Sequence, residues 1–168
     1  MDVLLRWFAP ILSFTTEEIF KIIKKKENDS IHLKDFPKLP ETWHNVKIFE
    51  RYDKLKSIRH VCNAAIEVKR TNKDVGSSLE TDLEVYLNKD YSKLIQDLDL
   101  SEFCITSKAE IKDLHKTGQK NLFNLDQVPG ISVLVKKAEG NKCERCWKIK
   151  KEVTKDNENK CKRCQKIK

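Results

Sequence analysis

Two Cys-x-x-Cys pairs limit what this chain can fold into more than any other feature of its sequence. The pairs are Cys143 with Cys146 and Cys161 with Cys164, and fourteen residues separate the second cysteine from the third. Each pair presents two thiolates from a tight turn, and a hairpin of this length brings four sulfurs together as a tetrahedral metal site. The spacing therefore predicts a metal-stapled finger over residues 140–168.

The four cysteines favour a structural zinc ion over redox chemistry or metal catalysis. A thioredoxin-like dithiol has one pair at a helix start after a strand, whereas this chain has two pairs among basic residues. Four thiolates leave no open coordination position, so the site should not activate water. Iron in a rubredoxin-like site stays open as an alternative, because four thiolates do not distinguish the two metals. Metal removal is expected to unfold the finger, since its bulky apolar residues are few: Trp147, Ile149, Val153 and Ile167.

The net charge of +8 is confined to the cysteine-containing end of the chain. Residues 136–168 hold 13 Lys or Arg against 5 Asp or Glu, while residues 1–135 hold 21 of each. Localised positive charge favours binding to a phosphate backbone, although a lysine-rich tail can also simply raise solubility. The candidate nucleic-acid contacts beside the metal ligands are Arg145, Trp147, Lys148, Lys150, Lys162 and Arg163.

Trp147 follows the second ligand directly, and two roles are open for it. Its ring can stack on an unpaired base, as in the recognition of single-stranded RNA loops, or it can pack over the metal hairpin. Elsewhere the four histidines are scattered, and the four glycines form no dinucleotide-binding or P-loop pattern. No nucleophile motif is present either, so no active site is predicted.

Apolar periodicity predicts helices in the first half of the chain. Three- and four-residue spacing indicates a helix over residues 3–12, broken near Pro10. A capping box, with Thr15 as the cap and Glu18 reaching back, predicts the start of a second helix that ends in the polar run 24–30. The residues expected to form a hydrophobic staple around this cap are Phe14 and Ile19.

The pattern changes further along the chain. Residues 31–47 carry two prolines and read as an extended connection, and a long helix is expected from about Ile48 to residues 74–76. Its apolar stripe should comprise Leu55, Ile58, Cys62, Ala65 and Lys69, flanked by Val61, Ile66 and Val68. Strands are then predicted over residues 81–88, 103–106 and 131–138, with a helix over 91–98.

These elements predict an α+β fold in three parts: a helical part over residues 1–78, a small α/β part over 79–139 and the finger over 140–168. The apolar run at the start is interrupted by Asp2 and Arg6 and lacks a cleavage site, so we expect an uncleaved cytoplasmic protein with reduced thiols and no membrane partner.

Three segments, taken in order, resemble the C-terminal part of bacterial isoleucyl-tRNA synthetase. They are "LLRWFAPILSFTTEEIF" (4–20), "IRHVCNAAIEVKRTNKDVGSSLETDLEVYL" (58–87) and "KCERCWKIKKEV" with "NKCKRCQ" (142–165). The first is similar to the family's Arg-Trp-x-Ala-Pro-x-Leu-Ser-Phe-Thr helix, and the second to its Lys-x-x-Gly-x-Ser-Leu-Glu helix exit. The third is similar to its terminal zinc finger, in which Trp147 matches the aromatic residue after the second ligand.

The resemblance implies the end of an anticodon-binding helical domain, a small α/β junction domain and a zinc module that helps to hold tRNA. The family attaches isoleucine to its tRNA with ATP and edits valine. Its HIGH and KMSKS signatures are absent here, so a non-catalytic fragment is expected, with ATP and Mg²⁺ bound only by the full-length enzyme. The implied partners are an isoleucine-accepting tRNA and the remainder of the synthetase, in a monomer.

Two other readings compete with this one. A DNA glycosylase of the formamidopyrimidine type also ends in a four-cysteine finger, which inserts into DNA, but the N-terminal proline nucleophile of that family has no counterpart here. Alternatively, the finger serves only to dock the chain on another protein surface.

Overall fold

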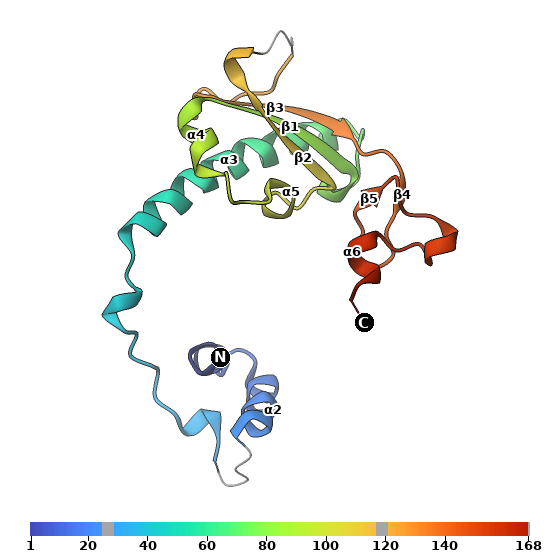
Figure 1. Ribbon diagram of the computed structural model, residues 1–168. Helices are drawn as coiled ribbons and strands as arrows, with labels where there is room; N and C mark the ends of the chain where they lie inside the picture. The colour runs from blue at the N-terminus through green and yellow to red at the C-terminus, as the bar shows by residue number, and fades with distance from the viewer. Residues whose placement is uncertain (25–28, 117–120, 168) are drawn as a thin grey trace. The chain divides into compact units, whose positions relative to one another are not determined.

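The computed structural model describes residues 1–24, 29–116 and 121–167, and it contains both helices and strands, as the predicted α+β class requires (Figure 1). The polar run 24–30 and the loop before the last sheet strand therefore lie partly outside the described residues.

The chain divides into two compact units, Met1–Asn45 and Val46–Lys168. The domain boundary predicted after residue 78 falls inside the second of these units. The three-part division accordingly stays a prediction about domain organisation.

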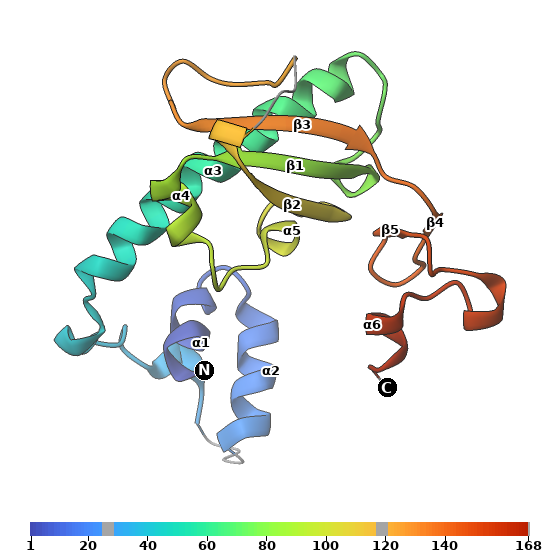
Figure 2. The same ribbon diagram turned by 45° about the horizontal axis from the view of Figure 1, so that its top comes forward.

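The first unit is built on two helices, α1 (Asp2–Phe8) and α2 (Ser13–Lys24), which lie side by side in Figure 2. The break expected near Pro10 is confirmed, because α1 ends at Phe8 and turns follow it. The buried cluster between the helices and the next segment contains Leu5, Ala9, Phe20 and Ile31. This small core is what organises the unit.

The predicted capping box at the start of α2 is wrong. The helix already begins at Ser13, and the backbone N–H of Thr16 donates to Leu12 at 2.9 Å, which places Thr15 inside the helix. The predicted staple also fails, since Phe14 is 92% exposed. Glu17 has a longer-range role that sequence reasoning missed: its carboxylate accepts from the Ser30 hydroxyl and from a backbone N–H, each at 2.9 Å.

The connection over residues 31–47 is largely irregular, as predicted. Two short 3-10 helices occur in it, η1 (Ile31–Leu33) and η2 (Glu41–Trp43). Ser30 caps η1 by accepting from the backbone N–H of His32.

The second unit begins with the long helix α3 (Val46–Thr71), which confirms the predicted helix. Its buried residues are Leu55, Ile58, Val61, Cys62, Ala65 and Ile66. Of the remaining predicted stripe residues, Lys69 is half-buried and Val68 is 47% exposed. The helix therefore presents one apolar face to the rest of the unit.

This face of α3 packs on a three-stranded sheet in the order β2-β1-β3 (Figures 1 and 2). The strands are β1 (Thr81–Leu87), β2 (Lys108–Asp113) and β3 (Ile131–Lys137). β1 runs parallel to β2 and antiparallel to β3, with Val85 opposite both Ile111 and Val133. Alternate residues of β1 face the helix, so the buried core of the unit lies between sheet and helix.

The segment between β1 and β2 differs from its prediction in the bounds of a helix and in the lack of a strand. The helix expected over residues 91–98 is α4 (Lys89–Leu94), which starts earlier because the Asn88 side chain caps it. The strand expected over 103–106 is absent from the described residues, because Phe103 ends the helix α5 (Leu100–Phe103) and a turn follows. A 3-10 turn, η3 (Ser78–Glu80), leads into β1, and another, η4 (Leu114–Lys116), follows β2.

The finger contains little regular structure. A two-stranded ribbon of β4 (Asn141–Lys142) and β5 (Ile149–Lys150) is followed by η5 (Lys155–Asn157) and by α6 (Lys162–Gln165). Within the described residues, no helix combines enough length with enough apolar character to span a bilayer.

Glu84 lies on the face of the sheet that α3 does not cover. Lys112 and Lys136 both pair with its carboxylate, and the Tyr86 hydroxyl donates to it at 2.9 Å. Hydrogen bonds from these partners, that from Lys112 above all, lower the pKa of Glu84 to about 2 from an ordinary value of 4.5. The charged form of Glu84 thus joins all three strands.

Replacing Glu84 with Gln removes both ion pairs and should lower the free energy of unfolding at pH 7. The loss should be only about 1 kcal/mol, because both lysines are exposed and solvent screens the pairs. A depressed carboxyl pKa stabilises the fold above about pH 4.5 and ceases to do so as the pH falls toward 2. The difference between wild type and variant should therefore shrink over that window in urea unfolding. Glu158→Gln, at an exposed pair with Lys160, is the control and should show almost no difference; equal behaviour of the two variants would contradict the role of Glu84.

Candidate metal centre and nucleic-acid interface

The four predicted metal ligands converge on one point. The sulfurs of Cys143, Cys146, Cys161 and Cys164 all lie within 4.8 Å of one another, and those of Cys146 and Cys161 are 3.8 Å apart. Metal–sulfur bonds of about 2.3 Å in tetrahedral geometry place the sulfurs about 3.8 Å apart. The cluster can therefore hold a metal ion, with four sulfur ligands and no open position.

Backbone hydrogen bonds shape the first turn of the cluster. The N–H of Cys143 donates to the carbonyl of Lys148 at 2.9 Å, and the N–H of Trp147 donates back to the carbonyl of Cys143 at 2.8 Å. Trp147 takes up a left-handed conformation, with φ of 65°. These hydrogen bonds close a tight turn that points both thiol groups of the first pair inward.

The thiols of the cluster titrate very differently. Burial acts to raise the pKa of Cys143, but the backbone N–H groups of Cys146, Cys161 and Arg145 outweigh it and lower this pKa to about 6. Burial, together with the neighbouring thiols, raises the pKa of Cys164 to about 12. A metal ion requires all four as thiolates, so metal binding should release protons.

Little else holds the finger together internally. Its buried cluster consists of cysteines and Val153, which is fully buried. Such a core buries little apolar surface for a segment of this length, so a metal ion held by the four cysteines would supply much of the folding free energy.

The finger is docked on the α/β part of the second unit through Ser107. This fully buried hydroxyl accepts from the backbone N–H of Ile149 at 2.6 Å and donates to the carbonyl of Leu79 at 2.5 Å. The Lys150 ammonium donates to the Ser107 carbonyl at 2.7 Å. Ser107, the residue just before β2, thus binds both the finger and η3, the turn that leads into β1.

Glu102 forms a second docking contact. Its Oε1 atom accepts from Lys148 Nζ at 2.8 Å and from Arg163 Nη1 at 2.6 Å. The pKa of Glu102 is lowered, first by the Lys148 hydrogen bond and further by the charge of Arg163. Lys148 is only 7% exposed. The α/β part therefore provides partners for three of the basic residues predicted to contact nucleic acid: Lys148, Lys150 and Arg163.

The other predicted contacts are more accessible. Trp147 is 59% exposed, so much of its ring is open to a ligand. Both Lys162 and Arg145 are exposed, although Arg145 also donates to the carbonyl of Ile167 at 2.9 Å. Sequence reasoning missed Lys142, whose ammonium lies 5.4 Å from the centre of the Trp147 ring. The signal in the sequence was that Lys142 directly precedes Cys143, the first predicted ligand, and lies across the turn from Trp147.

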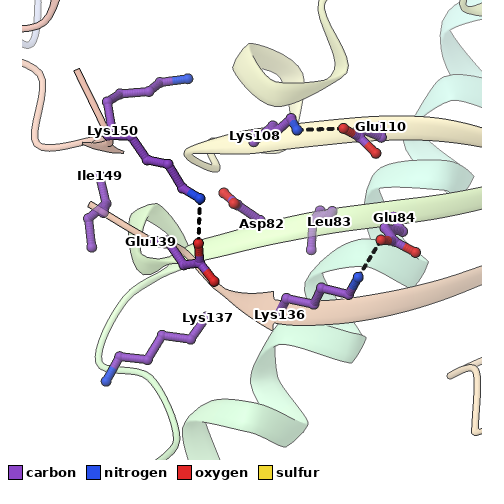
Figure 3. Close-up of a pocket in the computed structure, with 11 residues that line it drawn as sticks. Asp82, Leu83, Glu84, Lys108, Glu110, Lys136, Lys137, Glu139, Ile149 and Lys150 are labelled. Atoms are coloured by element: carbon purple, nitrogen blue, oxygen red, sulfur yellow. Dashed lines mark hydrogen bonds and ion pairs between the residues drawn. The ribbon is translucent and has the colours of Figure 1, made fainter. Parts of the chain in front are cut away.

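A groove of about 420 Å³ opens where β5 approaches the uncovered face of the sheet (Figure 3). Five lysines and four carboxylates line it. Most of these charges are paired, and Figure 3 shows Lys136 directed at Glu84 and Lys108 at Glu110. Burial raises the pKa of Asp82. With charges so nearly balanced, an anion would have to compete with carboxylates in this groove.

The family model for the anticodon-binding domain of tRNA ligase matches residues 1–87. Curated relatives cover most of the chain. A protein of Pelagibacter ubique is 46% identical over 151 residues, one of Bradyrhizobium diazoefficiens 38% over 156, and one of Rhodopseudomonas palustris 35% over 157. All three carry the name isoleucine–tRNA ligase. The matches cover 90 to 92% of this chain but only 15 to 16% of each relative.

Proposed function

Because the chain belongs to the family of anticodon-binding domains of tRNA ligases, we propose that it acts as a tRNA-binding part of isoleucine–tRNA ligase. The observation that carries the proposal is the joint match: the family covers residues 1–87, and isoleucine–tRNA ligases cover about 90% of the chain at up to 46% identity. The ligand is then the anticodon region of an isoleucine-accepting tRNA.

The metal in the finger is assigned as zinc, with Cys143, Cys146, Cys161 and Cys164 as ligands. The mutual sulfur distances and the lack of an open coordination position support a structural ion. The metal fixes the turn that carries Trp147 and Lys142, which together offer an aromatic face and a positive charge to an RNA loop. Elemental analysis of the purified chain should find one zinc per molecule, and iron would overturn the assignment.

Catalysis belongs to other parts of the ligase in this proposal. The sequence contains neither HIGH nor KMSKS, and the cysteine cluster keeps no position for a substrate. ATP, Mg²⁺ and isoleucine are accordingly ligands of the remainder of the enzyme, in the cytoplasm. ATP–pyrophosphate exchange by this chain alone would contradict this division of labour.

The remainder of the ligase is also the proposed partner of the first unit. Large apolar side chains of α1, α2 and their connection stay exposed: Leu4, Trp7, Phe8, Ile11, Leu12, Phe14, Ile22 and Ile23. So many exposed large apolar side chains on two short helices and their connection favour an interface there. The relatives are more than six times as long as the matched part, so they contain ample chain to cover it in a monomeric enzyme.

A salt titration tests the tRNA proposal. An isoleucine anticodon stem-loop should bind the metal-loaded chain, and its association constant should fall steeply with salt, by a log–log slope of about 0.7 to 0.9 per phosphate contact. A DNA duplex of equal length serves as the control and should bind more weakly. Equal binding of both nucleic acids would indicate a generic basic tail, and binding of neither would favour a docking role; either result contradicts the proposal.

A further inference from the structure

A second groove, whose lining includes none of the four clustered cysteines, lies between α3 and the turns that face it. It has a volume of about 560 Å³. One stripe of α3 forms its first wall, the loop over residues 76–78 its second, and the turn after α5 its third. The residues that line it are Arg59, Asn63, Ile66, Glu67, Arg70, Gly76, Ser77, Ser78, Cys104 and Ile105.

Arg59 is the principal charged group of this groove. Its guanidinium carbon lies 5.7 Å from the centre of the Phe103 ring, which holds the side chain in place. Its Nε atom is buried, and within the described residues it has no hydrogen-bond partner. Because Nε is buried, the donors that Arg59 can offer to a ligand are its two terminal Nη atoms, which make no hydrogen bond among the residues that the structure describes.

Further donors surround Arg59. Within the described part of the chain, the side chains of Asn63, Ser77 and Ser78 make no intramolecular hydrogen bond. The carboxylate in the lining, Glu67, already pairs with Arg70 at 3.1 Å. The groove thus presents a guanidinium, an amide and two hydroxyls, and its one negative charge is largely neutralised.

We propose that this groove binds a phosphodiester of an RNA strand, with Arg59 donating to the phosphate oxygens and Ser77 and Ser78 completing the contact. The inference rests on the proposed tRNA-binding function and adds a second contact outside the finger. An arginine beside hydroxyl and amide donors matches the acceptor oxygens of a phosphate.

The apolar part of the groove distinguishes a nucleotide from a bare anion or an acidic peptide. Ile105 is 49% exposed and takes up a left-handed conformation, with φ of 56°, which is rare for a β-branched residue. With Ile66 it gives the groove an apolar wall against which a ribose or a base can lie. In addition, α3 and the loop over residues 76–78 both fall within the segment that matches the anticodon-binding family.

The test compares Arg59→Gln with Lys54→Gln in the full chain. Lys54 is an exposed residue of the same helix that does not line the groove, so its replacement removes an equal charge. With a labelled anticodon stem-loop, Arg59→Gln should weaken binding about tenfold and reduce the salt slope by about 0.7 to 0.9. Lys54→Gln should leave both nearly unchanged. The double variant Ser77→Ala with Ser78→Ala, which keeps all charges, should weaken binding several-fold without changing the slope.

The outcomes separate this inference from the proposed function. If wild type binds the stem-loop and Arg59→Gln behaves like Lys54→Gln, the groove is not an RNA site although the chain still binds tRNA. If wild type fails to bind the stem-loop, both proposals are wrong. If Arg59→Gln loses RNA affinity because it unfolds, its thermal transition will show this. An unchanged affinity in the double serine variant would then overturn the proposal that the groove binds RNA.

Discussion

Removal of the metal should unfold the finger over residues 140–168 while the sheet and α3 stay folded. The finger buries only its cysteines and Val153, whereas binding of a structural zinc ion is worth about 10 to 16 kcal/mol near neutral pH. Without the metal, burial and the neighbouring thiols raise the pKa of Cys164 to about 12, so this thiol is protonated near neutral pH, and nothing replaces the four bonds. Hydrogen exchange with and without a chelator measures the effect: amides of the finger should lose protection, and those of β1 and β3 should keep it.

Two cysteine variants provide the control for this prediction. Cys161→Ser should lose the metal and the protection of the finger without any chelator. Cys104→Ala alters a buried cysteine of the main core and should keep its metal, even if its overall stability falls. Finger amides that stay protected after metal removal would contradict the view that the metal organises this segment.

Replacement of Glu102 with Ala should loosen the docking of the finger on the α/β part. The substitution leaves Lys148 as an almost fully buried charge without its partner and also releases Arg163. A hydrogen bond between charged groups is worth about 1.5 to 3 kcal/mol, and because Glu102 is half-exposed we expect a loss of about 1 to 2 kcal/mol. Urea unfolding measures the loss, and hydrogen exchange should place it at β4 and β5.

Glu158→Ala is the matched control, because Glu158 is an exposed finger residue whose pair with Lys160 lies at the surface. Its effect should be much smaller than that of Glu102→Ala, because solvent screens this exposed pair. Adding Lys148→Met to Glu102→Ala should recover part of the loss, since the buried charge is then gone. Equal effects of Glu102→Ala and Glu158→Ala would show that Glu102 does not hold the finger on the α/β part.

Features encoded by local spacing were predictable from the sequence. The cysteine cluster follows from two short turns, and the helix α3 follows from a regular apolar stripe whose buried members include Leu55, Ile58 and Cys62. The strands β1 and β3 likewise show a clear alternation. In each case the residues that define the element are near one another in the chain.

Features that depend on distant partners were not predictable. The strand β2, with the sequence KAEIKD, contains only two apolar residues, Ala109 and Ile111, which is too short an alternation to predict a strand; it pairs with β1 as a parallel neighbour. Nothing near Lys148 in the sequence indicates that it pairs with Glu102, 46 residues away. Glu17 was assigned to no role because its partners, Ser30 and Ile31, follow 13 and 14 residues later. Sequence reasoning therefore found the four-cysteine cluster that could hold a metal ion but could not tell which lysines dock the finger.

The most direct test of the account is a titration of a labelled isoleucine anticodon stem-loop against the zinc-loaded chain and against Cys161→Ser. If the metal holds a surface that binds tRNA, the variant should bind at least about tenfold more weakly and with a shallower salt dependence, because Trp147 and Lys142 are no longer fixed. Equal affinity and equal salt dependence of the two proteins would contradict the central claim that the zinc-stapled finger contributes to tRNA binding.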